Sequence, residues 1–158
     1  EEQMGIQSSV IESPHANLIL LDSGRKGILG EEQLNWLAEE LDKQADKPSL
    51  VFGHFNPYPN RGVRPIKGMR DGASLLELLA KRKHARAYLY GHTHQWQQDQ
   101  RDHLHIINQP AVSYYFGKGH AHGWVDMKLN AKSADLELQC IDPKHTQHGD
   151  RIQIVLKG

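Results

Sequence analysis

The residues with the clearest capacity for chemistry are three histidines in two short glycine-containing turns. His54 follows Gly53, and His92 and His94 belong to the segment GHTH at 91–94. Imidazole is the commonest metal ligand in proteins, and glycine lets the backbone turn sharply, so that ring nitrogens can point at a shared centre. The spacing predicts metal ligation. The alternative is polar loop histidines that only bind backbone groups, which fits each residue alone better than it fits the two turns together.

Two predicted strands end at these turns, with a helix between them. An apolar run over Ser49–Phe52 stops at the first turn, and a second run over Ala85–Tyr90 stops at the GHTH segment. The leucines between 75 and 79 indicate a helix, which Ser74 can cap. A right-handed crossover makes the two strands parallel. Both turns should therefore lie at the same rim of the sheet, where open α/β sheets bind their ligands.

The flanking segments complete an α/β pattern. Asn17–Leu21 is a predicted buried strand, and a helix should begin near Gly30. After Gln95 the apolar residues alternate with a period of two, which is typical of antiparallel strands with one polar face. The expected strands are His103–Ile107, Val112–Phe116, Trp124–Leu129, Leu136–Ile141 and Ile152–Leu156. We expect a single domain over residues 1–158, with a mixed sheet followed by antiparallel strands.

Composition narrows the classes of partner. The 158 residues contain 19 Lys and Arg against 19 Asp and Glu, so the net charge attracts neither nucleic acid nor an anionic membrane. Cys140 is the only cysteine, which excludes an intrachain disulfide and a thiolate metal cluster. Every apolar run is far shorter than the roughly 20 residues of a membrane span. The eleven histidines are the one unusual feature, and composition assigns no compartment.

The two turns resemble the later motifs of the calcineurin-like metallophosphoesterases, a GH after one strand and a GHxH after the next. The segments LLDS at 20–23 and EEQL at 31–34 are similar to the strand, loop and helix that precede the GH motif in that family. The resemblance implies an α/β fold that is the C-terminal half of a four-layer αββα sandwich. It covers most of the chain.

The same resemblance implies a metal-dependent phosphoesterase that hydrolyses a phosphate monoester or diester. His54 and His92 would bind one metal of a pair and His94 the other, with Thr93 as a variable spacer. The cofactors would be two divalent ions, with manganese, iron and zinc all suited to imidazole ligands beside carboxylates. A metal-bound hydroxide would attack the phosphorus of a bridged phosphate ester.

The earlier motifs of the family do not occur in this sequence. No aspartate has a histidine two places on, no asparagine precedes a histidine, and the only Gly-Asp pair is Gly149-Asp150. We therefore expect the chain to be the C-terminal part of a larger domain that supplies only the histidine half of a dinuclear site. Alone it should bind the metals at most partly and should be inactive. We also expect self-association or pairing with the missing N-terminal half.

A non-catalytic alternative keeps the same fold. In it the chain is a metallophosphoesterase-like scaffold that binds a protein partner, and the missing motifs are its main support. The two intact Gly-His turns argue against it, because a scaffold without chemistry has no need for three ligands at one rim.

Weaker candidates surround the histidines. Asn56 and Arg64, in the loop after His54, could contact a phosphate-ester substrate, as could His120 and His122 in a glycine-rich loop. Solvated loop residues are the competing interpretation of Arg64, His120 and His122. The aromatic residues at 114–116 could line a pocket, but aromatic strand residues more often belong to a core or an interface.

Overall fold

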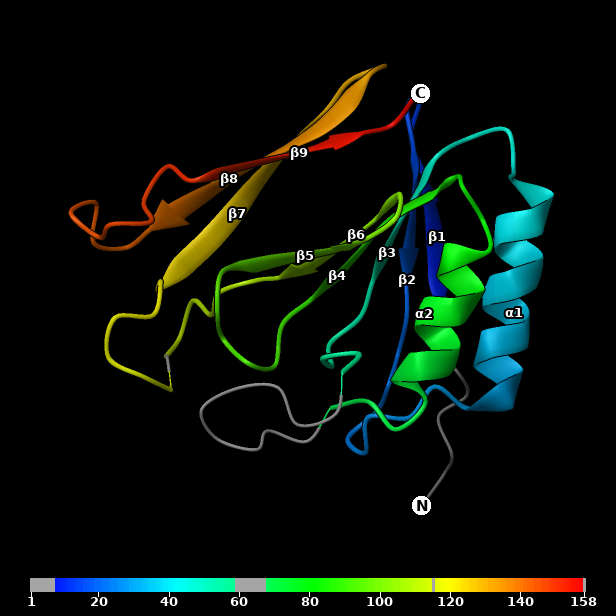
Figure 1. Ribbon diagram of the computed structural model, residues 1–158, viewed down its shortest axis with the longest axis horizontal. Coiled ribbons are helices and arrows are strands. Elements are labelled where there is room, and N and C mark those ends of the chain that lie inside the picture. The colour runs from blue at the N-terminus through cyan, green and yellow to red at the C-terminus, as the bar shows by residue number, and fades with distance from the viewer. Residues whose placement is uncertain (1–7, 59–67, 115, 158) are drawn as a thin grey trace.

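A computed structural model of the chain describes residues 8–58, 68–114 and 116–157, which form two β-sheets and two helices (Figure 1). The helices are α1 (Gly30–Lys43) and α2 (Gly72–Ala80). The strands are β1 (Ser9–Glu12), β2 (Asn17–Leu20), β3 (Ser49–Phe52), β4 (Ala85–Tyr90), β5 (Gln97–Arg101), β6 (Leu104–Asn108), β7 (Gly123–Leu129), β8 (Ser133–Cys140) and β9 (Arg151–Val155).

The larger sheet is mixed, and its four central strands are parallel. Its order is β1-β2-β3-β4-β6-β5, with β1 and β5 antiparallel at the two edges. β2, β3, β4 and β6 run in the same direction, so their carboxyl ends all meet one rim of the sheet. The predicted parallel pairing of β3 with β4 is confirmed, and with it the common rim for the two Gly-His turns.

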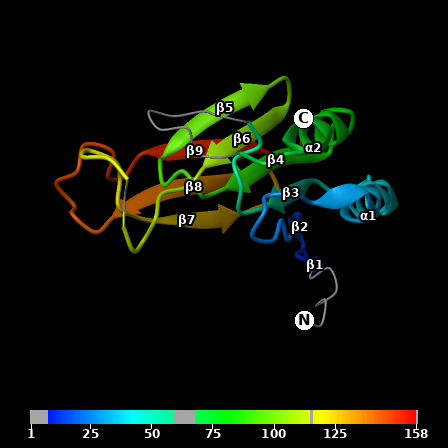
Figure 2. The ribbon, with the colours of Figure 1, turned by 90° about the horizontal axis from the view of Figure 1, so that it is seen from below.

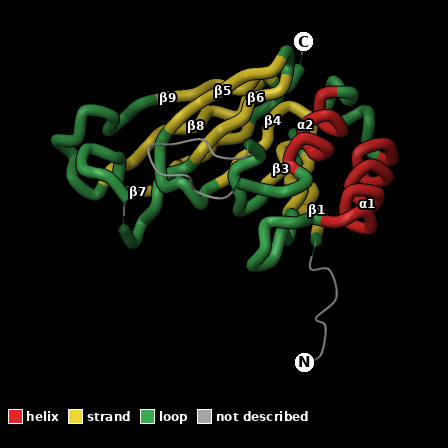
Figure 3. Tube along the Cα trace, turned by 60° about the horizontal axis from the view of Figure 1, so that its bottom comes forward, coloured by secondary structure: helices red, strands yellow, loops and turns green. Residues whose placement is uncertain are grey.

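The two faces of the mixed sheet are covered by different layers. Figures 2 and 3 show α1 and α2 together on one side of the strands. Leu37 and Leu41 of α1 and Leu75 and Leu79 of α2 are fully buried in the core between helices and sheet. A helix with one apolar stripe is stable only when that stripe is covered in this way.

The three-stranded antiparallel sheet, ordered β7-β8-β9, packs against the opposite face. Its period-two alternation places Leu136 and Ile154 in the core between the sheets, beside Leu89 and Ile107 of the mixed sheet. The predicted mixed sheet with antiparallel strands after it is confirmed. The described residues form three layers of the αββα arrangement: helices, mixed sheet and antiparallel sheet.

The start of α2 differs from the prediction. Asp71 is its N-cap residue, and Ser74 is an exposed residue inside the helix. The Asp71 carboxylate also accepts hydrogen bonds from the backbone N–H groups of Leu29, at 2.9 Å, and Gly30, at 2.8 Å. These groups stand at the N-terminus of α1, where backbone donors lack partners within the helix. One carboxylate therefore joins the starts of both helices.

Two edge strands were not predicted, and one predicted strand is wrong. β5 has the sequence QQDQR, and as an edge strand it carries polar residues on both faces. The described residues of the segment expected as a strand over Val112–Phe116 form bends, and only Ala111 makes an isolated bridge, to His122. Neither helix in the described part of the chain has the length and hydropathy needed to cross a membrane.

Candidate metal site

The two Gly-His turns are joined by backbone hydrogen bonds at the carboxyl ends of β3 and β4. The N–H of Gly53 donates to the carbonyl of Leu89 at 3.0 Å, and the N–H of Gly91 donates to the carbonyl of His54 at 3.1 Å. The parallel pairing of the strands thus continues into both turns. These hydrogen bonds hold the backbones of the two histidine-containing turns in register with each other.

Position 53 requires glycine because the ring of Tyr88 lies directly over it. A Cβ atom there would stand 2.5 Å from the Tyr88 hydroxyl oxygen, which is far inside van der Waals contact. That hydroxyl donates a hydrogen bond of 2.9 Å to the carbonyl of Phe55, and burial raises the pKa of the Tyr88 phenol. Tyr88 therefore fixes the path of the turn that carries His54.

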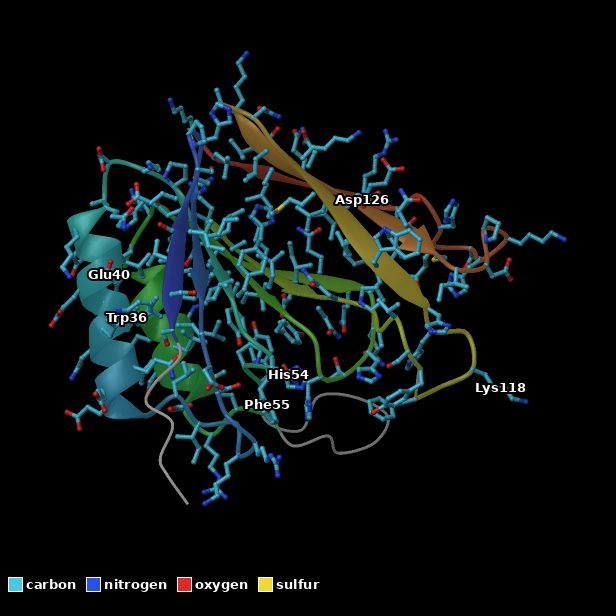
Figure 4. All side chains as sticks on the ribbon, turned by 180° about the vertical axis from the view of Figure 1, so that it is seen from behind. Trp36, Glu40, His54, Phe55, Lys118 and Asp126 are labelled. Carbon is cyan, nitrogen blue, oxygen red and sulfur yellow. The ribbon has the colours of Figure 1, made fainter. Side chains whose placement is uncertain are left out.

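His54 and His92 face each other across the two turns. The Nε2 atom of His54 lies 3.2 Å from the Nδ1 atom of His92, with the ring planes at 75°. The ring of Phe55 packs against both imidazoles, with centroids 4.2 Å from His92 and 5.2 Å from His54. Figure 4 shows His54 and Phe55 side by side in the turn after β3, away from Asp126 on β7.

The GHTH segment holds both of its histidines in the left-handed backbone region. The φ angle is 61° at His92 and 52° at His94, values that few non-glycine residues adopt. Thr93 between them is buried, and its hydroxyl accepts a hydrogen bond from the side-chain amide of Asn108. Thr93 therefore holds the turn in place. No role was predicted from the sequence for Asn108, which ends β6. A polar residue at the carboxyl end of an apolar strand is the signal that could have indicated it.

The His94 ring points into a small aromatic group. It stacks on Phe116, with centroids 4.4 Å apart and planes at 15°, and meets Tyr114 edge-on at 4.7 Å. Burial lowers the pKa of His94. Within the described residues, no three histidine, cysteine or acidic side chains gather closely enough to hold a metal ion. The structure thus brings His54 and His92 into contact, while His94 packs on Phe116 and Tyr114.

Three of the weaker substrate candidates lie in the described residues, where each contacts another group of the chain. Asn56 is buried, and its Oδ1 accepts a hydrogen bond of 3.0 Å from the N–H of Tyr58. The Asn56 side chain thus stabilises the loop to which it belongs. His120 lies 3.3 Å from the Gln95 amide beside a cavity of about 210 Å³. His122 contacts the carbonyl of Val112. Arg64 lies outside the described residues.

The facing imidazoles suit a divalent metal ion. Two imidazole nitrogens that each lie about 2.1 Å from one ion, at a ligand–ion–ligand angle of about 100°, are about 3.2 Å apart. That is the separation between the facing nitrogens of His54 and His92. One ion could bind both rings with little movement of either turn.

Comparison with curated proteins identifies similar phosphodiesterases. The chain is 29% identical over 124 residues to the 3',5'-cyclic adenosine monophosphate phosphodiesterase CpdA of Pseudomonas aeruginosa, covering 75% of this chain and 45% of that protein. It is 36% identical over 94 residues to the probable glycerophosphodiester phosphodiesterase GpdQ of Arcobacter nitrofigilis, covering 55% of this chain and 34% of that protein. The chain therefore spans less than half the length of these relatives.

The fold and a family profile agree with these similarities. A dimetal phosphatase from Danio rerio superposes with a TM-score of 0.73 at 15% sequence identity, over 96% of this chain and 61% of that one. The profile of the calcineurin-like phosphoesterases matches residues 9–96, a segment that contains both Gly-His turns. The chain belongs to the calcineurin-like phosphoesterase family.

Proposed function

We propose that this chain serves the metal-dependent hydrolysis of a phosphodiester. In this proposal His54 and His92 bind one divalent ion, and His94 binds a second. The single observation that carries it is the 3.2 Å separation of the facing nitrogens of His54 and His92, at the rim where four parallel strands end. Diesters are favoured over monoesters because the curated relatives described above are named as phosphodiesterases.

Divalent ions bound at such a site supply Lewis acidity toward the phosphoryl oxygens and lower the pKa of a coordinated water. The residues of this chain have the task of holding the imidazoles. The hydrogen bond from Gly91 to the carbonyl of His54 fixes the spacing of the two turns. Phe55 packs against both rings and limits their rotation. The Asn108 amide binds the hydroxyl of Thr93, which lies between His92 and His94.

The proposal assigns the chain the histidine part of the site only. The carboxylate-containing motifs typical of this family do not occur in its sequence. We therefore propose that these residues bind one ion weakly by themselves, and that turnover needs ligands from outside the chain. The native metal is left open among manganese, iron and zinc, which all bind imidazole.

The test uses manganese, whose unpaired electrons broaden the phosphorus resonance of any phosphate ester close to it. Bis(p-nitrophenyl) phosphate is titrated with Mn²⁺ and the chain, and the ³¹P linewidth is compared between wild type and the variant His54→Ala/His92→Ala at equal metal concentration. The proposal expects extra broadening with wild type that the variant loses. Equal linewidths would contradict it. If wild type binds Mn²⁺ without any effect on the ester, the scaffold alternative is favoured instead.

A further inference from the structure

Three large apolar side chains of the loop between β6 and β7 are exposed, and two of them, Tyr114 and Phe116, contact His94. Val112 is 59% exposed, Tyr114 56% and Phe116 44%. The sequence favoured a core or interface position for the aromatic residues, and the described ones are neither buried nor part of a strand. Exposed aromatic side chains that contact one another are a candidate ligand-binding surface.

The two described rings of this loop are held in a defined arrangement. Tyr114 and Phe116 meet edge to face, with centroids 5.5 Å apart and planes at 83°. His94 stacks on Phe116 and also touches the edge of Tyr114, so the imidazole braces both rings from the side of the GHTH segment. Because both residues remain about half exposed, each ring still offers surface to a ligand. An ordered, partly exposed aromatic pair is suited to stacking on a planar group.

The GHTH segment links this aromatic pair to the facing imidazoles. His92 points toward His54, and His94, two positions later, packs on Phe116. The aromatic pair thus adjoins the segment that carries His92, because His94 in that segment contacts both rings. A nucleotide likewise carries its phosphate and its base on one sugar, close to each other.

Resting on the proposed function, we propose that Tyr114 and Phe116 form a stacking platform for the nucleobase of a nucleotide phosphodiester substrate, whose phosphate lies at His54 and His92. Every nucleobase has a flat face that stacks on aromatic side chains, and such stacking strengthens binding without reading the base sequence. A glycerophosphodiester has no planar group and would leave both rings in water. The platform thus selects nucleotides over glycerol esters.

The experiment measures binding to the whole chain by saturation-transfer NMR in the presence of Zn²⁺. The probes are adenosine 5'-monophosphate, ribose 5-phosphate and adenosine, so base and phosphate are tested apart. The proposal expects adenosine monophosphate to bind about tenfold more tightly than ribose 5-phosphate, with saturation strongest on the adenine protons. Tyr114→Ala should lose this preference and Tyr114→Phe should keep it. Trp124→Ala, which removes an aromatic ring that is 48% exposed on β7, is the matched control.

The outcomes separate this proposal from the proposed function. Equal affinity for adenosine monophosphate and ribose 5-phosphate, or a preference unchanged in Tyr114→Ala, would overturn the platform while phosphate binding still supports the phosphodiesterase. If ribose 5-phosphate fails to bind but adenosine binds and Tyr114→Ala abolishes its binding, the platform stands and the phosphate site fails. Binding of none of the three probes overturns both.

Discussion

The side-chain amide of Asn108 donates a hydrogen bond to the hydroxyl of Thr93, and both residues are buried. This contact ties the carboxyl end of β6 to the segment that carries His92 and His94, both of which have positive φ. The hydrogen bond from Asn108 helps to hold this unfavourable backbone, since left-handed conformations of non-glycine residues persist only when the surrounding structure supports them.

The first prediction concerns this hydrogen bond. Thr93→Val keeps the shape of the side chain but leaves the Asn108 amide buried without a partner, which should lower the free energy of unfolding by about 1–3 kcal/mol. Urea unfolding followed by circular dichroism measures the change. Thr93→Ser retains the hydroxyl and serves as the control. A Thr93→Val protein as stable as wild type would show that the contact does not hold the turn.

Gly53 provides a second prediction. Gly53→Ala places a Cβ atom against the Tyr88 hydroxyl, and overpacking of this kind should cost about 1–3 kcal/mol in the free energy of unfolding. The cost should be smaller in a Tyr88→Phe background, where the hydroxyl is gone. A double-mutant cycle by thermal unfolding tests the coupling, and additive effects of the two substitutions would count against the close approach.

The third prediction compares two residues at the start of α2. Asp71→Ala removes the acceptor for the N–H groups of Leu29 and Gly30, and should reduce the free energy of unfolding by about 1–2 kcal/mol. Ser74→Ala should change it very little, because Ser74 is exposed within the helix. Denaturant midpoints of the two variants decide between Asp71 and Ser74 as the stabilising residue, and a reversed order would contradict the structure.

A pH dependence is expected from His105. Burial, and then the positive charge of Arg86, lower the pKa of His105. The Gln98 amide, at 3.0 Å from Nδ1, can donate only to the neutral ring. As the pH falls below the pKa of an unfolded histidine, the unfolded chain takes up a proton that the folded chain resists, so the fold loses stability.

NMR titration of the His105 ring protons measures this pKa directly. In the variant His105→Gln, the loss of stability between neutral and mildly acidic pH should be smaller than in wild type. The result that would rule out the expected linkage is a His105 pKa at or above the usual value for histidine.

The sequence was a good guide where a pattern has a single physical cause. Ala85–Tyr90 is apolar, stops at a glycine and forms β4 with the predicted bounds. The position of His54 and His92 at one rim followed from the handedness of the strand-helix-strand crossover. Both features depend on local patterns and on one general rule of chain topology.

Other features depend on contacts between distant residues, which no local pattern shows. The edge strand β5 is polar on both faces, so its sequence shows no alternation of apolar and polar residues. It forms a strand because its backbone pairs with that of β6. Phe116 was predicted to belong to a strand, but it lies in a loop, and its ring packs on His94. This ring contact joins residues that are 22 positions apart in the printed sequence.

The central claim is that His54 and His92 together bind a divalent ion. The most direct measurement is metal content by elemental analysis after equilibration with Mn²⁺ or Zn²⁺. Wild type is compared with His54→Ala/His92→Ala and with a control variant, His103→Ala/His105→Ala. In the control, His103 directly precedes β6 and His105 lies within it. Because the proposed binding is weak, the metal content is compared at equal free metal after equilibrium dialysis. The account predicts up to one bound equivalent in wild type and in the control, and none in His54→Ala/His92→Ala. Equal metal content in all three proteins would contradict it.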